Sequence, residues 1–168
     1  GNMGRCSAPH DHGLTLANYH KAGEKEVHSA IESAARAAKT WNRMAWQERL
    51  AVFNKAADLI AGPYRMLMNA ATMLGQGKNA FQAEIDSACE IIDFLRYNTF
   101  FATQIYGGQP DSGKGEWNQL EYRPLEGFVF AIAPFNFTAI SGNLSSAPAM
   151  LGNTVLWKPA SSSVYSSY

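Results

Sequence analysis

The 168-residue chain has few cysteines, no excess of charge and no long apolar run, and each shortage excludes a class of protein. Cys6 and Cys89 lie far apart and form no CxxC pair, so neither a disulfide framework nor a zinc site is indicated. Lysine plus arginine equals aspartate plus glutamate at 14 each, which gives no electrostatic reason to expect nucleic acid or an anionic membrane as partner. The longest apolar run, residues 128–135, is too short to insert across a bilayer.

Short motifs that would assign a function directly are also absent. The chain has no GxGxxG or GxxxxGK[ST] nucleotide fingerprint and no GxSxG nucleophile elbow. The His10-Asp11-His12 stretch has no third or fourth ligand nearby, so solvated polar residues are favoured over a metal ion and no metal site is expected. The start, GNMGRCSAPHDHG, lacks the apolar core of a secretory signal, and the isolated cysteines favour a reducing compartment.

Helical periodicity dominates the first hundred residues, where apolar side chains recur at intervals of three and four. Four helices are predicted, over residues 27–41, 50–60, 63–74 and 79–101. The pair Gly62-Pro63 separates the second from the third, because glycine ends helices well and proline suits a first turn. Residues 1–26 show only a short apolar alternation, so a loop or a short edge strand is expected there.

The fourth predicted helix has one carboxylate on the wrong face. A projection at about 100° per residue gives one continuous apolar face, formed by Phe81, Ile85, Ala88, Ile91, Ile92 and Leu95. Asp86, Glu90 and Asp93 fall on the opposite side and are expected to be solvated. Glu84 falls inside the apolar arc, where a carboxylate is costly unless it is paired or protonated. It is therefore a candidate site residue, although a small error in helical phase would put it at the boundary instead.

The second part of the chain changes from helical to α/β character. Residues 119–123 alternate polar and apolar, residues 128–132 are wholly apolar, and the turn between them predicts a β-hairpin. A helix rich in small residues is expected over 137–151, followed by a strand over 153–157. Strand, helix and strand in this order predict a parallel βαβ unit. With only two strands of its sheet, the chain is interpreted as the front portion of a larger α/β protein.

Two polar residues of this part are candidates for chemistry. Asn136 follows the apolar strand, and its amide could stabilise a developing oxyanion or could simply cap the next helix. Local sequence alone favours the cap. Lys158 closes the second strand, at the edge where open α/β sheets bind their ligands. An ordinary solvated lysine is the alternative, and for a lone lysine it would be preferred.

Two motifs together resemble the aldehyde dehydrogenase superfamily. These are APFNFTA (133–139) and GNTVLWKPAS (152–161), which in that family occur in this order about twenty residues apart. The stretches GQGKNAFQAEIDSACEIIDFLRYN, YRPLEGFVFAIAPFNFTAISGNL and APAMLGNTVLWKP are similar to one branch, the mitochondrial Δ1-pyrroline-5-carboxylate dehydrogenases, also called glutamate-semialdehyde dehydrogenases. The resemblance runs from about residue 9 to residue 168.

The resemblance implies a role for each residue of the APFN turn. The family oxidises an aldehyde bound to a catalytic cysteine, passes hydride to a nicotinamide cofactor and hydrolyses the resulting thioester. Asn136 matches the oxyanion donor, and Lys158 matches a residue that binds the adenosine ribose. Ala133, Pro134 and Phe135 match the turn on the nicotinamide side of NAD. Position 133 is more often serine in this branch, so any contact of Ala133 would be through its backbone.

The resemblance also implies a substrate region, a partner and a compartment. Phe137 matches a residue lining the aldehyde channel, and Glu84 matches a helix glutamate near the substrate. The expected fold is α/β: N-terminal helices, the start of a Rossmann-like parallel sheet and a β-hairpin extension. Residues 1–168 would be the N-terminal part of the NAD-binding domain, and 108–132 part of a β-extension through which family members form homo-oligomers. The implied location is the mitochondrial matrix.

The chain departs from the family in what it does not contain. The nucleophilic cysteine, the general-base glutamate and the glycine-containing cofactor turn are absent, and neither Cys6 nor Cys89 matches the catalytic motif. The catalytic domain is expected to be absent and the 168 residues alone to be inactive, whereas the complete enzyme would oxidise L-glutamate 5-semialdehyde to L-glutamate with NAD. The alternatives are a non-catalytic truncated isoform that binds other subunits, and an aldehyde dehydrogenase for another aldehyde.

Overall fold

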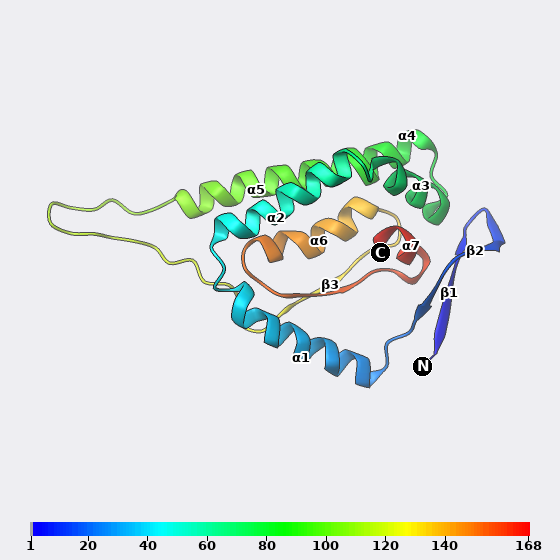
Figure 1. Cartoon of the computed structure of the whole chain (residues 1–168), viewed down its shortest axis with the longest axis horizontal. Coiled ribbons are helices and arrows are strands. Elements are labelled where there is room, and N and C mark those ends of the chain that lie inside the picture. The colour runs from blue at the N-terminus through cyan, green and yellow to red at the C-terminus, as the bar shows by residue number, and fades with distance from the viewer. Residues whose placement is uncertain (1) are drawn as a thin grey trace.

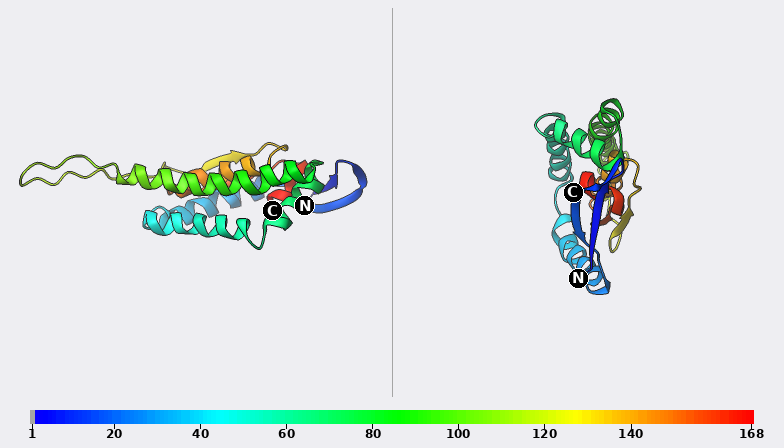
Figure 2. Two further views of the ribbon diagram at one scale, coloured as in Figure 1. Left: turned by 90° about the horizontal axis from the view of Figure 1, so that it is seen from above. Right: turned by 90° about the vertical axis from the view of Figure 1, so that its right-hand side faces the viewer.

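The structure, a computed structural model, describes residues 2–168 and combines helices with an antiparallel two-stranded sheet and a parallel two-stranded sheet (Figure 1). Its elements in chain order are β1 (Met3–Ala8), β2 (Asp11–His20), α1 (Glu24–Trp41), α2 (Trp46–Ala61), α3 (Arg65–Gln76), α4 (Ala80–Ala83), the π-helix η1 (Glu84–Glu90), α5 (Ile91–Gly107), β3 (Val129–Ile132), α6 (Thr138–Met150), β4 (Val155–Lys158), the 3₁₀-helix η2 (Ser161–Ser163) and α7 (Val164–Ser167). The chain termini lie at the same end of the elongated molecule (Figure 2).

The first residues form an antiparallel hairpin. The strand alternative predicted for 1–26 is present as β2, but β2 is ten residues long and pairs with a second strand, β1, that was not predicted. β1 pairs with β2, and the register shifts on either side of Ser7. Cys6 is buried, and its thiol donates to the Ser162 carbonyl at 3.3 Å. The hairpin is therefore attached to the last helical segment of the chain, a long-range contact that the sequence pattern does not indicate.

The three predicted helices before residue 77 are confirmed as α1, α2 and α3. α3 ends at Gly77, whose φ of 64° lies in the left-handed region that glycine adopts without strain. The buried face of α3 differs from the apolar pattern, since Leu67 and Leu74 are exposed and Thr72 is fully buried. The polar Thr72 is buried because it faces the first turn of α6, where it finds a hydrogen-bond partner.

The fourth predicted helix exists, but it is not one α-helix. α4 leads into η1, and α5 then continues to residue 107. Phe81 and Ile85, expected in the core, are 84% and 65% exposed, whereas Asp86, expected in solvent, is only 2% exposed. A π-helix bonds residue i to i+5 instead of i+4, so the α-helical projection loses its phase across η1. Asp86, not Glu84, is the carboxylate that this helix buries.

The hydrophobic core lies between α2, α5 and α6, which run side by side in Figure 1. Its buried members are Leu50, Ala57, Ala88, Ile91, Ile92, Leu95, Ala102, Ala139 and Met150. The small residues of α6 permit close approach, as predicted. A Cβ placed on Gly142 would lie 2.7 Å from the end of the Ile91 side chain, so any larger residue there would require Ile91 to move.

The predicted βαβ unit is confirmed. β3 and β4 pair in parallel, with Val129 opposite Val155 and Ile132 opposite Lys158, and α6 is the connection between them. α6 ends before Gly152, whose φ is 92°. The carboxyl ends of the two strands therefore lie side by side, which places the residues that follow β3 next to those that end β4.

The predicted hairpin between 119–123 and 128–132 is wrong. Residues 119–123 form no strand, and the strand that β3 pairs with is β4. The chain from Gly108 to Phe128 is an irregular arm that projects beyond the end of α5 (Figures 1 and 2). Side chains link the outgoing and returning segments of chain in this arm: the Gln109 amide oxygen accepts from the Leu120 N–H at 2.8 Å.

Candidate functional site

The candidate site lies where the carboxyl ends of β3 and β4 meet. The Ala133 N–H donates to the Lys158 carbonyl at 3.0 Å, which extends the pairing one residue past β3. This bond brings the turn at 133–135 next to Lys158, and the family resemblance implies that both bind the same cofactor. Lys158 is exposed, and its Nζ donates to the carbonyl of the adjacent Pro159 at 3.1 Å.

Asn136 does not cap the following helix, so the interpretation that local sequence favoured is wrong. α6 begins at Thr138 with Phe137 as its N-cap residue, and no side chain of the cap residue bonds to the helix. Asn136 is exposed, and its carbonyl accepts from Lys78 Nζ at 2.6 Å. Within residues 2–168, the Asn136 amide makes no hydrogen bond. Both donors of this amide therefore face no competing acceptor from the described residues.

The N-terminus of α6 is instead capped by Asp86 from η1. Asp86 Oδ2 accepts from the Thr138 N–H at 2.9 Å, and Oδ1 accepts from the Ala139 N–H at 2.8 Å. A carboxylate suits this position because the first N–H groups of a helix have no intrahelical acceptor and carry partial positive charge. The prediction that Asp86 is solvated is wrong, because the π-helix η1 changes the helical phase on which that prediction depended.

Lys78, a residue that sequence reasoning missed, links this cap to Asn136. Its Nζ donates to Asp86 Oδ2 at 2.8 Å and to the Asn136 carbonyl at 2.6 Å. The same ammonium lies 4.3 Å from the centroid of the Phe137 ring, within the range of a cation–π contact. Lys78 and Asp86 stand only eight residues apart, but no periodic pattern relates them to the turn that they contact.

The two phenylalanines beside Asn136 are accessible. Phe135 is 66% and Phe137 is 38% exposed. Asn136 thus stands between two aromatic side chains at the surface of the described chain. Apolar side chains that adjoin an exposed amide donor in this way can contact an organic molecule that the amide binds.

Glu84 lies outside this cluster. The Arg65 guanidinium donates to Glu84 Oε1 from Nε at 2.9 Å, and the Asn69 amide donates to Oε2 at 2.5 Å. The bond to Arg65, followed by that to Asn69, holds the pKa of the Glu84 carboxyl below its ordinary value of 4.5. Glu84 is half-buried, which is the boundary position left open by the helical projection, and it is paired with Arg65 of α3, as a carboxylate on this face requires.

Cys89 follows Glu84 by five residues in η1. It is exposed, and its sulfur lies 3.6 Å from an Arg65 nitrogen and 3.9 Å from Glu84 Oε1. Cys89 therefore belongs to the Glu84 cluster and not to the residues at the carboxyl ends of the strands.

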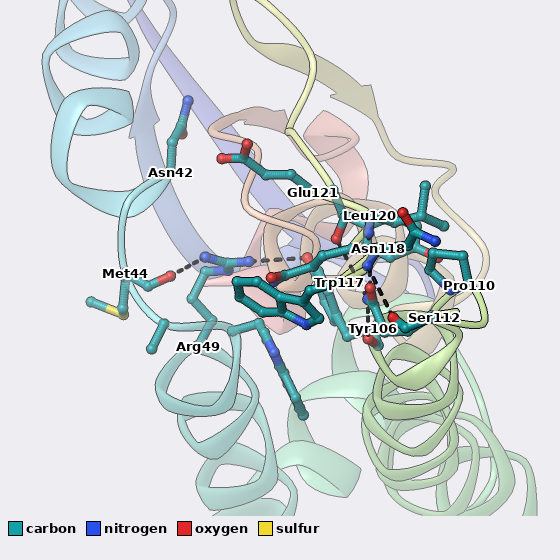
Figure 3. A pocket seen from close by; sticks show the side chains of 15 residues that line it. Asn42, Met44, Arg49, Tyr106, Pro110, Ser112, Trp117, Asn118, Leu120 and Glu121 are labelled. Carbon is teal, nitrogen blue, oxygen red and sulfur yellow. Dashed lines mark hydrogen bonds between the residues drawn. The ribbon is translucent and has the colours of Figure 1, made fainter. Parts of the chain in front are cut away.

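A cavity of about 620 Å³ lies at the base of the arm, away from the predicted site residues (Figure 3). One wall is the arm itself, and the other is the turn before α2 with the end of α5. Arg49 donates to the carbonyls of Met44 and Met150 and to the Tyr106 hydroxyl, so its polar groups are engaged. The ring of Trp46 stacks on Tyr106 at 5.2 Å.

Within residues 2–168, no group of three or more His, Cys, Asp or Glu side chains is arranged to hold a metal ion. No helix of the same range is both long and apolar enough to cross a membrane.

A family model for the aldehyde dehydrogenase family matches residues 3–168. The chain therefore belongs to the aldehyde dehydrogenase family, and the predicted resemblance is confirmed. Among its relatives, the probable delta-1-pyrroline-5-carboxylate dehydrogenase of Schizosaccharomyces pombe is 54% identical over 167 residues, which cover 99% of this chain and 30% of that protein. The mitochondrial delta-1-pyrroline-5-carboxylate dehydrogenase of Homo sapiens is 48% identical over 161 residues, which cover 96% of this chain and 29% of the relative.

The solved structures that are similar to this chain include further pyrroline-5-carboxylate dehydrogenases. The Δ-pyrroline-5-carboxylate dehydrogenase of Mycobacterium tuberculosis, solved with NAD and cobalamin, has a TM-score of 0.97 and 50% identity over all of this chain and 32% of its own. The 1-pyrroline-5-carboxylate dehydrogenase from Thermus with bound NAD has a TM-score of 0.89 and 31% identity, covering 99% of this chain and 32% of its own. The predicted fold class is confirmed. The chain spans about 30% of the length of the relatives it matches.

Proposed function

We propose that these residues form the front of the NAD-binding domain of a dehydrogenase that oxidises L-glutamate 5-semialdehyde, derived from pyrroline-5-carboxylate, to L-glutamate in proline catabolism. One observation carries the proposal: the Asn136 amide has no acceptor among residues 2–168, and its segment is held by Lys78 and Asp86 at the carboxyl end of β3. The names of the relatives support this substrate, and their bound NAD supports the cofactor.

In this proposal Asn136 donates a hydrogen bond to the oxygen of the aldehyde as negative charge develops there. A donor of this kind accelerates the reaction only if it is in place before the charge forms, because reorientation would cost free energy in the transition state. The engaged carbonyl of Asn136 fits that requirement, since it fixes the main chain and leaves the amide available. Phe137, half-exposed beside Asn136, would line the path of the aldehyde, and Glu84 would lie near the substrate.

The residues at the strand ends fit a nicotinamide dinucleotide. NAD, when bound, supplies the acceptor for the hydride that leaves the aldehyde carbon. Lys158 is exposed at the carboxyl end of β4 and bonds only to the adjacent carbonyl, so its ammonium can reach a ribose hydroxyl. The turn of Ala133, Pro134 and Phe135 lies beside it. The Ala133 N–H is already used by Lys158, so any contact of Ala133 with the cofactor is through its carbonyl.

The arm is proposed to be part of an oligomerisation extension that spans residues 108–132. It projects from the helices and carries apolar side chains in solvent: Trp117 is 84% exposed and Leu125 is 69% exposed. Apolar side chains on a projecting segment suit burial against another subunit. A mitochondrial matrix location is also proposed, because relatives from Emericella nidulans and Homo sapiens are named as mitochondrial.

The test uses the complete natural polypeptide that carries these residues. Purified protein is assayed for NADH formation with glutamate 5-semialdehyde and, in parallel, with acetaldehyde and succinic semialdehyde. We expect glutamate 5-semialdehyde to give the highest kcat/KM, and Asn136→Ala to lower kcat by about 100-fold to 1,000-fold. NADH formation only with another aldehyde would favour a different dehydrogenase. Protein that forms subunit complexes but oxidises none of the three would establish the non-catalytic alternative.

A further inference from the structure

The segment that holds Asn136 is fixed by two charged residues that lie fifty or more residues earlier in the chain. We infer that Lys78 and Asp86 are positioning residues for the oxyanion donor: they hold the main chain on either side of the Asn136 side chain so that its amide is preset. This inference rests on the proposed function. It concerns how the donor is held, which neither the family resemblance nor the names of the relatives describe.

The first part of the device is a carboxylate that bonds to two successive amides. Asp86 uses one oxygen for the Thr138 N–H and the other for the Ala139 N–H, at 2.9 and 2.8 Å. Two bonds from one rigid carboxylate fix both the place and the direction of the first turn of α6, which a single bond would not do. The carboxylate is 2% exposed, so water does not compete for these amides.

The second part is an ammonium that reaches the turn before the helix. Lys78 Nζ bonds to both Asp86 Oδ2 and the Asn136 carbonyl, so the same charge pair holds the chain before and after Phe137. Lys78 itself has little freedom. It lies between the left-handed Gly77, which ends α3, and Asn79, whose side chain accepts from the Gln82 N–H at 2.9 Å to cap α4.

A third contact holds the same turn from α3. The Thr138 hydroxyl lies 2.8 Å from the Thr72 hydroxyl and accepts from the Gln76 amide at 2.7 Å. The segment around Asn136 is therefore held by residues of α3, by Asp86 of η1 and by Lys78, which lies between α3 and α4. The side chain of Asn136 takes part in none of these bonds, so the described contacts fix its backbone and leave its donors unused.

The π-helix explains how a charged residue comes to this place. η1 buries three successive residues, Asp86, Ser87 and Ala88, a run that an α-helical face does not present. The Ser87 hydroxyl donates to the Ala83 carbonyl at 2.8 Å, the acceptor that the Ser87 N–H would use in an α-helix. π-segments are frequent at functional sites, and here the segment turns a carboxylate toward the amides of α6.

The experiment is a double-mutant cycle on the complete natural polypeptide. Asp86→Asn removes the charge and one of the two acceptors with almost no change in shape. We expect it to lower kcat by up to about 100-fold, the effect of displacing a reacting group by about 1 Å, with little change in KM for NAD. In the Asn136→Ala background, Asp86→Asn should lower kcat little further, because the group through which it acts is already missing.

Three further variants separate positioning from general damage. Lys78→Met should lower kcat, and Lys78→Arg should restore part of the loss because it keeps a donor near the carbonyl. Asp58→Asn is the matched control, since Asp58 pairs with Arg96 at 3.1 Å on the exposed side of the helices. It should leave kcat unchanged.

Amide exchange provides a measurement that does not depend on activity. Asp86→Asn should speed exchange of the Thr138 and Ala139 amides by about tenfold, as expected from the loss of a hydrogen bond to a charged acceptor, and Asp58→Asn should not. Equal fractional losses of kcat for Asp86→Asn in the otherwise unaltered protein and in the Asn136→Ala background would overturn the inference. Unchanged exchange of the two amides would overturn it as well. Absence of aldehyde oxidation in the unaltered protein would overturn the proposed function, while exchange would still decide whether Asp86 holds the turn.

Discussion

The continuous helix from Ala80 to Gly107 has two parts that bury different chemistry. α5 presents Ile91, Ile92 and Leu95 to α2 and α6, and these side chains make the hydrophobic core. η1 presents a carboxylate and a hydroxyl, and each has hydrogen-bond partners on other elements. The apolar part packs α5 against α2 and α6, whereas the polar part determines how the first turn of α6 is oriented. Stability and site geometry are thus assigned to neighbouring parts of one helix.

The largest expected effect on stability comes from the apolar part. Leu95 is 4% exposed within the core cluster. Leu95→Ala should lower the free energy of unfolding of the complete polypeptide by about 2–5 kcal/mol, because it removes buried methyl groups and leaves a cavity. Denaturant titration measures the loss. At a temperature where the variant is folded, kcat should stay within about twofold of the unaltered value, since uncoupled sites act independently. A large loss of kcat would show that core and site are not separable.

A smaller loss is expected from the polar part. The buried Ser87 hydroxyl lies 2.8 Å from the Asn69 side-chain oxygen and 2.8 Å from the Ala83 carbonyl, and its single hydrogen is shared between these two acceptors. Ser87→Ala should lower the free energy of unfolding by about 1–3 kcal/mol, the cost of leaving a buried acceptor without its donor. Ser33→Ala on the exposed face of α1 is the matched control and should change little. A Ser87→Ala protein as stable as the unaltered one would mean that the η1 hydroxyl contributes nothing to the fold.

The same two parts show what could be predicted from the sequence. The α/β class, the βαβ unit and the core positions Ile91, Ile92 and Leu95 follow from periodicity, because α5 and α6 are regular helices. The buried Asp86 does not follow, because periodicity assumes one angle per residue and η1 breaks that assumption. Its partners add no local signal either: the two amides that it caps are 52 and 53 residues away.

Candidate site residues could be named from the sequence, but the residues that hold them in place could not. For Asn136 and Lys158 local sequence favoured a helix cap and a solvated lysine, and their proposed roles at a site come from the family resemblance. The structure brings their segments together. Lys78 was not identified, since a single lysine after a glycine looks like an ordinary solvated residue. A hairpin was predicted because alternation favours a strand, but residues 119–123 form none and β3 pairs only with β4 among residues 2–168, since alternation does not specify which segments pair.

The carboxyl groups at the two ends of η1 offer a test by pH. Glu84 opens the segment, and its bonds to Arg65 and Asn69 hold its pKa below 4.5 in the folded protein. A lowered folded pKa contributes stability that is present above the ordinary value and is lost as pH falls through the folded value. Glu84→Gln should therefore lower Tm at pH 7, and the difference from the unaltered protein should shrink as pH falls below about 4.5. A Tm difference that is constant with pH would contradict the pairing.

Glu90 closes the segment, and the smallest effect, of opposite sign, is expected there. Burial, and after it the charge of Asp86, raises the pKa of the Glu90 carboxyl above its ordinary value of 4.5. The stability that Glu90 contributes is fully present below the ordinary value and is lost as pH rises through the raised folded value. Glu90→Gln, which mimics the protonated form, should therefore raise Tm slightly at pH 7 and have no effect below about pH 4. Asp93→Asn, on the exposed face of α5, serves as the control and should leave Tm nearly unchanged at both pH values. A lower Tm for Glu90→Gln at pH 7 would contradict this expectation. It would mean that the ionised Glu90 carboxylate stabilises the fold despite the negative charge of Asp86 nearby.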